Sequence, residues 1–131
     1  MHIDCIADSN TEWNDIYLKR PFPFVFFLGL EVQYSDIDIK ITIDTRYIGN
    51  EARYVRKSCT PNCEIRNYRT GHHINFVLVS LREIEPEEEL TIPFDFPWRK
   101  AQFEFDCFCK RGEDCEVKKR KSMIDKPDYL K

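Results

Sequence analysis

The chain has 131 residues, of which 42% are hydrophobic and 33% are charged, a composition typical of one globular domain rather than a disordered segment. Its net charge of −3 does not call for a nucleic-acid partner, and no apolar run is long enough to span a bilayer, so no membrane association is expected. The first residues, MHIDCIADSN, carry acids and no apolar block, unlike a secretory signal. We therefore expect an intracellular, reducing compartment, where clustered cysteines bind metal more often than they form disulfides.

The sequence of the first half of the chain indicates short strands. Residues 1–20 are polar and weakly patterned, and they predict no element. Aromatic and β-branched residues predict strands at 24–30 and 39–43, joined by a turn-rich connection. Residues 49–55 are expected to form one or two helical turns.

The middle of the chain predicts a hairpin. Residues 63–69 and 74–81 are expected to pair, with Gly71 supplying the turn. His72 and His73 fall at its tip. Neighbouring residues of a strand point to opposite faces, so this pair of histidines suits solvent better than a shared metal.

An acidic segment, REIEPEEEL (82–90), follows the hairpin. Its like charges would repel one another if buried, so it is expected to be a solvated turn. It leads into TIPFDF (91–96), where Pro93 lacks a ladder donor, which predicts an edge or irregular strand. The expected fold class is mostly β, with short strands and irregular links.

Three cysteines in DCFCKRGEDC have the spacing C-x-C-x5-C. They are Cys107, Cys109 and Cys115. Three thiolates so close together suit zinc, which takes four ligands in a tetrahedron. The fourth ligand must come from elsewhere, and Cys59 or Cys63 of RYVRKSCTPNC can provide it. The alternative, three ordinary packed cysteines, fits their hydrophilic neighbours poorly.

Two further interpretations stay open on the residues alone. Cys59 could act as a nucleophile if a histidine base lay beside it. A basic run could contact nucleic-acid phosphates, though weakly, given the acidic chain. This run comprises Arg53, Arg56, Lys57, Arg66 and Arg69. The KKRK segment (118–121) fits nuclear import, a phosphate contact or a solvated tail equally well.

Three segments in order resemble a SET domain followed by its post-SET cysteines: GNEARYVRKSCTPNCEIR, EEELTIPFDF and CFCKRGEDC, within about residues 40–116. The usual patterns are R-F-x-N-H-S-C-x-P-N, E-L-T-Y-D-Y and C-x-C-x4-C. The resemblance implies a SET-domain fold of short twisted sheets, with a pseudoknot-like C-terminal segment and few short helices. It divides the chain into a divergent SET domain (1–106, with residues 1–20 replacing or truncating the usual first strands), a post-SET zinc segment (107–117) and a basic tail (118–131).

The resemblance also implies the ligands of a structural zinc. The cysteine of the N-H-S-C pattern corresponds to Cys59, which joins the three later cysteines. Cys63 is then a spare packed residue near the site. The post-SET spacer is one residue longer than usual. The implied components of the pseudoknot are Arg53, Ser58, Pro61, Asn62 and residues 91–96.

SET domains are known as lysine methyltransferases that use S-adenosylmethionine, and the implied cofactor site is degenerate here. No G-x-G turn occurs, Arg56 and Lys57 replace the Asn-His pair, and Phe96 replaces a tyrosine hydroxyl. Two cations beside a sulfonium cost about 1 kcal/mol per close pair even in water-like surroundings. We expect S-adenosylmethionine to bind poorly, if at all, and Arg56 and Lys57 to face an acidic protein or phosphate instead.

PFPFVFF, IDTRYIGNEARYVRKSCTPN and LTIPFDF resemble one divergent branch, that of the yeast SET-three deacetylase-complex subunit, its yeast paralogue and their animal relatives. This branch implies a nuclear, catalytically impaired binding or scaffold module of a chromatin regulator. Its expected partners are a histone tail or chromatin-complex proteins. The alternative is an active histone lysine methyltransferase.

Overall fold

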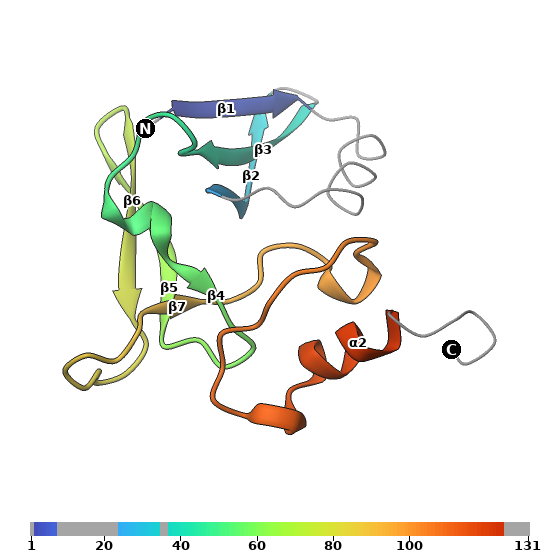
Figure 1. The fold of residues 1–131 in the computed structure, drawn as a ribbon. Coiled ribbons are helices and arrows are strands. Elements are labelled where there is room, and N and C mark those ends of the chain that lie inside the picture. The colour runs from blue at the N-terminus through green and yellow to red at the C-terminus, as the bar shows by residue number, and fades with distance from the viewer. Residues whose placement is uncertain (1, 8–23, 35–36, 125–131) are drawn as a thin grey trace. The chain divides into compact units, whose positions relative to one another are not determined.

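The computed structural model describes residues 2–7, 24–34 and 37–124 (Figure 1). The chain forms two compact units, and each unit is assembled from two separate stretches. The first unit takes in residues 1–54 and 95–105. The second unit takes in residues 55–94 and 106–131. The expectation of a mostly β chain with few short helices is confirmed.

The first unit is built on a three-stranded antiparallel sheet in the order β1-β3-β2. Its strands are β1 (His2–Ala7), β2 (Val25–Tyr34) and β3 (Ile37–Asp44). Both predicted strands are present but longer than expected, and the predicted turn-rich connection is wrong over most of its length. Strand β1 was not predicted. Its alternation of polar and apolar residues is short, and its pairing partner lies far along the sequence.

Val25, Phe26 and Ile43 are buried in the first unit. Phe24 has a left-handed backbone with φ of 64°, and its carbonyl accepts two hydrogen bonds from Thr45, from Oγ1 at 2.6 Å and from N–H at 2.9 Å. Such a conformation is strained for an aromatic residue, and the paired hydrogen bonds hold it in place.

Two 3-10 helices complete the first unit. One is η1 (Glu51–Tyr54), which confirms the helical turn expected at 49–55. The other is η2 (Trp98–Lys100).

The second unit contains the predicted hairpin, formed by β5 (Cys63–Thr70) and β6 (His73–Ser80). Gly71 adopts φ of 60° at the turn, as expected, and His72 and His73 are exposed. A short parallel pair joins β4 (Arg56–Lys57) to β7 (Thr91–Ile92). The strand expected over 91–96 therefore ends before Pro93, which lacks the donor to continue it.

The last described elements of the second unit are η3 (Gly112–Asp114) and α2 (Glu116–Ile124). From residue 118 onward, the sequence predicted only a basic tail. Helix α2 begins directly after Cys115, and Val117, which is 2% exposed, anchors its first turn in the interior. In the described part of the chain, every helix is too short or too polar to cross a bilayer.

Candidate metal centre

Four cysteines of the second unit meet in one cluster. They are Cys59, Cys107, Cys109 and Cys115, and their sulfur atoms all lie within 4.8 Å of one another. The Sγ atoms of Cys59 and Cys115 are 3.7 Å apart, and the backbone N–H of Cys59 donates to Cys107 Sγ at 3.2 Å. Cys115 is fully buried, and Cys107 is 5% exposed.

This cluster fits zinc. A tetrahedral ion with Zn–S bonds of about 2.3 Å holds its sulfurs about 3.8 Å apart. The Cys59–Cys115 separation agrees with that spacing, and four thiolates are a donor set that zinc prefers. When bound, a zinc ion would crosslink residue 59 to the segment 107–115 and so stabilise the second unit.

The thiols of the cluster differ in acidity. Burial, together with hydrogen bonds to the other three cysteines, raises the pKa of Cys59 to about 12. Burial also raises the pKa of Cys107. Burial acts in the same direction at Cys109, but a backbone hydrogen bond from Arg111 and the neighbouring thiols outweigh it and lower its pKa to about 7. A divalent cation supplies the charge that allows all four groups to ionise together.

Two alternatives from the sequence gain no support from this geometry. Cys63 lies outside the cluster and is buried, and its neighbours include Arg82 and Glu88. No histidine belongs to the cluster among the described residues, so the structure brings no histidine base to Cys59.

Arg56, which the resemblance places at a cofactor-binding asparagine, is engaged within its own unit. Its guanidinium lies 3.4 Å from the centroid of the Phe108 ring. The same group forms a two-pronged ion pair with Glu89, with Nη2 at 2.6 Å from Oε2 and Nε bonded to Oε1. We call this arrangement of Arg56, Glu89 and Phe108 the Arg56 stack. Arg56 therefore has partners within its own unit while its side chain stays exposed, and the expectation that it also faces an external partner stays a prediction.

Lys57 contributes its backbone to the same junction. Its carbonyl accepts a hydrogen bond from the Phe108 N–H at 3.1 Å. Lys57 pairs with Ile92 in the parallel ladder, and the Lys57 side chain is half-buried. The Arg56–Lys57 segment thus serves to dock the segment that carries the metal ligands.

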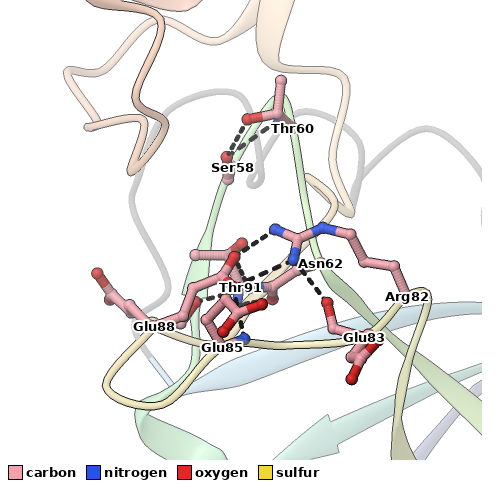
Figure 2. A network of polar contacts seen from close by, with 9 residues as sticks. Ser58, Thr60, Asn62, Arg82, Glu83, Glu85, Glu88 and Thr91 are labelled. Atoms are coloured by element: carbon pink, nitrogen blue, oxygen red, sulfur yellow. Dashed lines mark hydrogen bonds and ion pairs between the residues drawn. The ribbon is translucent and has the colours of Figure 1, made fainter.

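A buried polar network lies beside this junction (Figure 2). Asn62, which is 3% exposed, donates through Nδ2 to the Glu89 carbonyl at 2.8 Å and accepts through Oδ1 from the Thr91 N–H at 2.8 Å. Nδ2 also reaches Glu88 Oε1 at 3.3 Å. These bonds tie the loop after Cys59 to the segment 89–91, in agreement with the role that the resemblance implied for Asn62.

The acidic turn is not simply solvated. Figure 2 shows the Arg82 side chain directed toward Glu88, with which it forms a two-pronged ion pair. Glu88 also accepts from the backbone N–H of Glu85 at 3.1 Å. The hydrogen bond from Arg82, aided by Glu85 and Asn62, lowers the pKa of Glu88 to about 2. Two glutamates of the turn therefore have specific basic partners, Glu88 with Arg82 and Glu89 with Arg56.

Phe96 belongs to the first unit. Its ring packs against Phe105 edge to face, at 5.1 Å between centroids, and against Phe103 at 5.7 Å. The position that the resemblance assigns to a tyrosine is thus part of an aromatic cluster, and phenylalanine offers no hydroxyl there.

The basic run considered for nucleic acid is divided between the two units. Arg53 belongs to the first unit, where its guanidinium lies over the Tyr54 ring at 4.7 Å. In the second unit, Arg56 belongs to the stack, and Arg66 forms an ion pair with Glu64. At least three of the five cations therefore have partners of their own, which reduces the charge available for phosphates.

An open cavity of about 670 Å³ lies in the second unit beside the metal ligands, within the size range of small-molecule sites. Four basic side chains, Arg56, Arg82, Lys110 and Lys118, and two carboxylates, Glu88 and Glu89, line it. Both arginines are paired with these carboxylates, so the wall offers binding groups of mixed charge.

The comparisons with known proteins agree with this architecture. The family model described as "SET domain" matches residues 3–95. The chain belongs to the SET-domain family. The match covers most of the chain, including the hairpin, the Arg56–Cys59 segment and the acidic turn.

Several curated relatives are named as histone methyltransferases. The human protein "Inactive histone-lysine N-methyltransferase 2E" is 39% identical over 113 residues, which cover 85% of this chain and 6% of that protein. "Histone-lysine N-methyltransferase set-9" of Caenorhabditis elegans is 32% identical over 68 residues, 51% of this chain and 4% of the relative. "Probable histone-lysine N-methyltransferase set-23" of Caenorhabditis briggsae is 30% identical over 113 residues, 86% of this chain and 46% of the relative. The chain thus spans less than half the length of these relatives.

Sequence reasoning missed Glu89 and Phe108 as members of this site. Phe108 stands between two cysteines, so its position beside the metal ligands was visible in the spacing. No local pattern identifies its contact with Arg56, because the two residues are far apart in the chain.

Proposed function

We propose that this SET domain is catalytically impaired and acts as a binding or scaffold module of a nuclear chromatin regulator. From the resemblance to the branch of the yeast SET-three deacetylase-complex subunit, we further propose a link to histone deacetylase complexes and transcription control. The partners in this proposal are a histone tail or chromatin-complex proteins. The relative named as inactive in human supports the loss of activity.

One observation carries the proposal. Arg56 occupies the asparagine position of the cofactor motif, and its guanidinium is committed to Glu89 and Phe108. An asparagine offers an amide that can both donate and accept, whereas a guanidinium has no acceptor. The residues present therefore do not fit S-adenosylmethionine, which would place a sulfonium cation near a fixed positive charge.

Phe96 supports the same conclusion. It stands where a tyrosine hydroxyl would orient the lysine amine and the methyl group, and its ring is surrounded by Phe103 and Phe105. Loss of that hydroxyl alone would slow methyl transfer, and together with the altered cofactor motif it removes both binding and orientation.

We further propose that the four clustered cysteines bind one structural zinc and that residues 107–117 form a post-SET segment. The support is the donor set and its spacing, which suit tetrahedral zinc. In this proposal the metal stabilises the binding surface and takes no part in chemistry.

Titration calorimetry with S-adenosylmethionine tests the proposal on the zinc-loaded protein. We expect no heat of binding at cofactor concentrations that saturate an active SET enzyme run alongside. Methyl transfer from labelled cofactor to histone octamers is the second assay, and robust labelling by the unmodified chain would overturn the proposal.

An active S-adenosylmethionine-dependent histone lysine methyltransferase is the second candidate. The observation that favours it is the names of the two Caenorhabditis relatives, which do not describe those proteins as inactive. Measurable cofactor affinity would favour this function.

A further inference from the structure

Phe108 stands between two of the four clustered cysteines in the sequence, so any contact that holds Phe108 also holds Cys107 and Cys109. Its ring is covered by the guanidinium of Arg56. Arg56 in turn lies three residues before Cys59. The Arg56–Phe108 contact therefore joins the same two segments that a metal ion would join.

Two backbone hydrogen bonds at this junction join the same two segments. The Phe108 N–H donates to the Lys57 carbonyl at 3.1 Å, and the Cys59 N–H donates to Cys107 Sγ at 3.2 Å. These two hydrogen bonds hold the segments in register, and neither of them is a bond to a metal.

Glu89 fixes the direction of the Arg56 side chain. Its carboxylate grips two nitrogens of the guanidinium, and its backbone carbonyl accepts from the buried Asn62. The carboxylate is therefore carried by a residue whose backbone is bonded to a buried side chain. With the guanidinium held in one plane, its face is presented to the Phe108 ring.

We propose that Arg56 is a positioning residue for the metal centre: it holds the Cys107–Cys109 segment against Cys59 before zinc binds and thereby sets the affinity for zinc. Without the stack, metal binding must order that segment and lose its conformational entropy. With the stack, the ligands are presented at high effective concentration. The residue that departs from the cofactor motif has, in this view, become part of the support of the metal site.

Arginine suits this task better than lysine or asparagine. A planar guanidinium can stack on a ring through its face while its edge pairs with a carboxylate, whereas an ammonium cannot do both with the same geometry. Asparagine is too short for the same reach. This inference rests on the zinc site of the proposed function, and it does not depend on whether the cofactor binds.

The experiment measures zinc affinity by competition with a chromogenic chelator, together with the rate of zinc release to excess chelator. Arg56→Ala should raise the zinc dissociation constant about tenfold, the size typical of lost support around metal ligands, and should speed release. Arg56→Lys should give a smaller loss. Phe108→Leu removes the ring but keeps an apolar side chain, so it should match Arg56→Ala and serves as the second variant if Arg56→Ala fails to fold.

Arg82→Ala is the matched control. It removes another exposed arginine whose carboxylate partner lies on the same turn, and Arg82 has no contact with Phe108 among the described interactions. Its zinc affinity should stay within about twofold of the unmodified protein. Unfolding of the zinc-free proteins in urea separates a specific loss of affinity from a general loss of stability.

The inference is overturned if Arg56→Ala and Phe108→Leu bind zinc as tightly as the unmodified chain, or if Arg82→Ala loses as much affinity. An unmodified chain that fails to bind zinc overturns it as well. Cofactor titration reports separately on the proposed function, so methylation by a chain that passes the zinc tests would remove the function and leave the inference standing.

Discussion

The side-chain carbonyl of Asn62 accepts a 2.8 Å hydrogen bond from the backbone N–H of Thr91, and both residues are buried. The amide nitrogen of Asn62 donates to the Glu89 carbonyl at the same distance. The Asn62 side chain thus satisfies two backbone groups of the segment 89–91, the Glu89 carbonyl and the Thr91 N–H. Because Asn62 and Thr91 are buried, water does not take over these hydrogen bonds.

Asn62→Ala should therefore destabilise the protein by about 2 kcal/mol or more, because it leaves buried backbone groups without partners. Urea unfolding followed by far-UV circular dichroism would measure the change. Asn67→Ala, at an exposed position of the hairpin, is the control and should change stability by less than about 0.5 kcal/mol. Equal effects of the two substitutions would contradict a structural role for the Asn62 network.

The lowered pKa of Glu88 predicts that the stability of the protein depends on pH. Its pKa is lowered from 4.5 to about 2 in the folded protein, chiefly by the hydrogen bond from Arg82. A carboxyl with a lowered pKa stabilises the fold above its unfolded pKa, and this contribution is lost as pH falls from about 4.5 toward 2. Glu88→Gln should therefore be less stable than the unmodified protein near neutral pH, and the difference should shrink through that window.

Chemical unfolding of the unmodified protein and of Glu88→Gln over the acidic range measures this difference in stability. Zinc release at low pH affects both proteins, so its effect largely cancels in the difference. Glu104→Gln, at an exposed position of the first unit, controls for the loss of one negative charge. A Glu88→Gln difference that grows as pH falls would rule out the assigned ion pair as its source.

Metal analysis should find about one zinc per chain, and Cys109→Ser should lose it, because three thiolates and a hydroxyl bind zinc far more weakly than four thiolates. Cys63→Ser is the matched control, since Cys63 lies outside the cluster, and it should keep the metal. Thermal melting completes the test. If removal of zinc with a chelator leaves the melting temperature unchanged, the site is not structural.

Phe96→Tyr alone should not restore methyl transfer. The added hydroxyl would have no bound methyl donor to act on while Arg56 and Lys57 occupy the cofactor motif, and residues that act as a unit give strongly non-additive effects. Calorimetry and labelled-methyl transfer on histone octamers provide the readouts. The informative comparison is the triple substitution Arg56→Asn, Lys57→His, Phe96→Tyr. Activity of the single variant would place the defect at the missing hydroxyl instead.

The metal ligands were the most predictable part of the site. Three of them lie within nine residues, and their spacing is a local property that survives any uncertainty about the fold. The choice of Cys59 over Cys63 required the resemblance to a known motif, because two cysteines four residues apart fit the spacing argument equally well. The structure places the sulfur of Cys59 with the other three.

The partners of Glu88 and Glu89 could not be predicted in the same way. A run of acidic residues is expected to be solvated unless specific cations pair with it. Here Arg82, at the end of the hairpin, pairs with Glu88, and Arg56, more than thirty residues earlier, pairs with Glu89. The extra length of β2 and β3 has a similar origin. Residues 31–34 and 37–38 have modest strand preference alone, and pairing with each other extends the ladder.

Each compact unit is made of two stretches that alternate along the chain, and this order has a consequence for synthesis on the ribosome. The first stretch of one unit must wait for residues 95–105 to emerge. The second unit has only Cys59 of its four clustered cysteines until Cys107 is made, and it has all four only once Cys115 has been added. Neither unit corresponds to a contiguous fragment. A nascent chain stopped before residue 95 would therefore hold two incomplete cores. The first unit requires the chain through residue 105, and the second requires it through the cysteine segment.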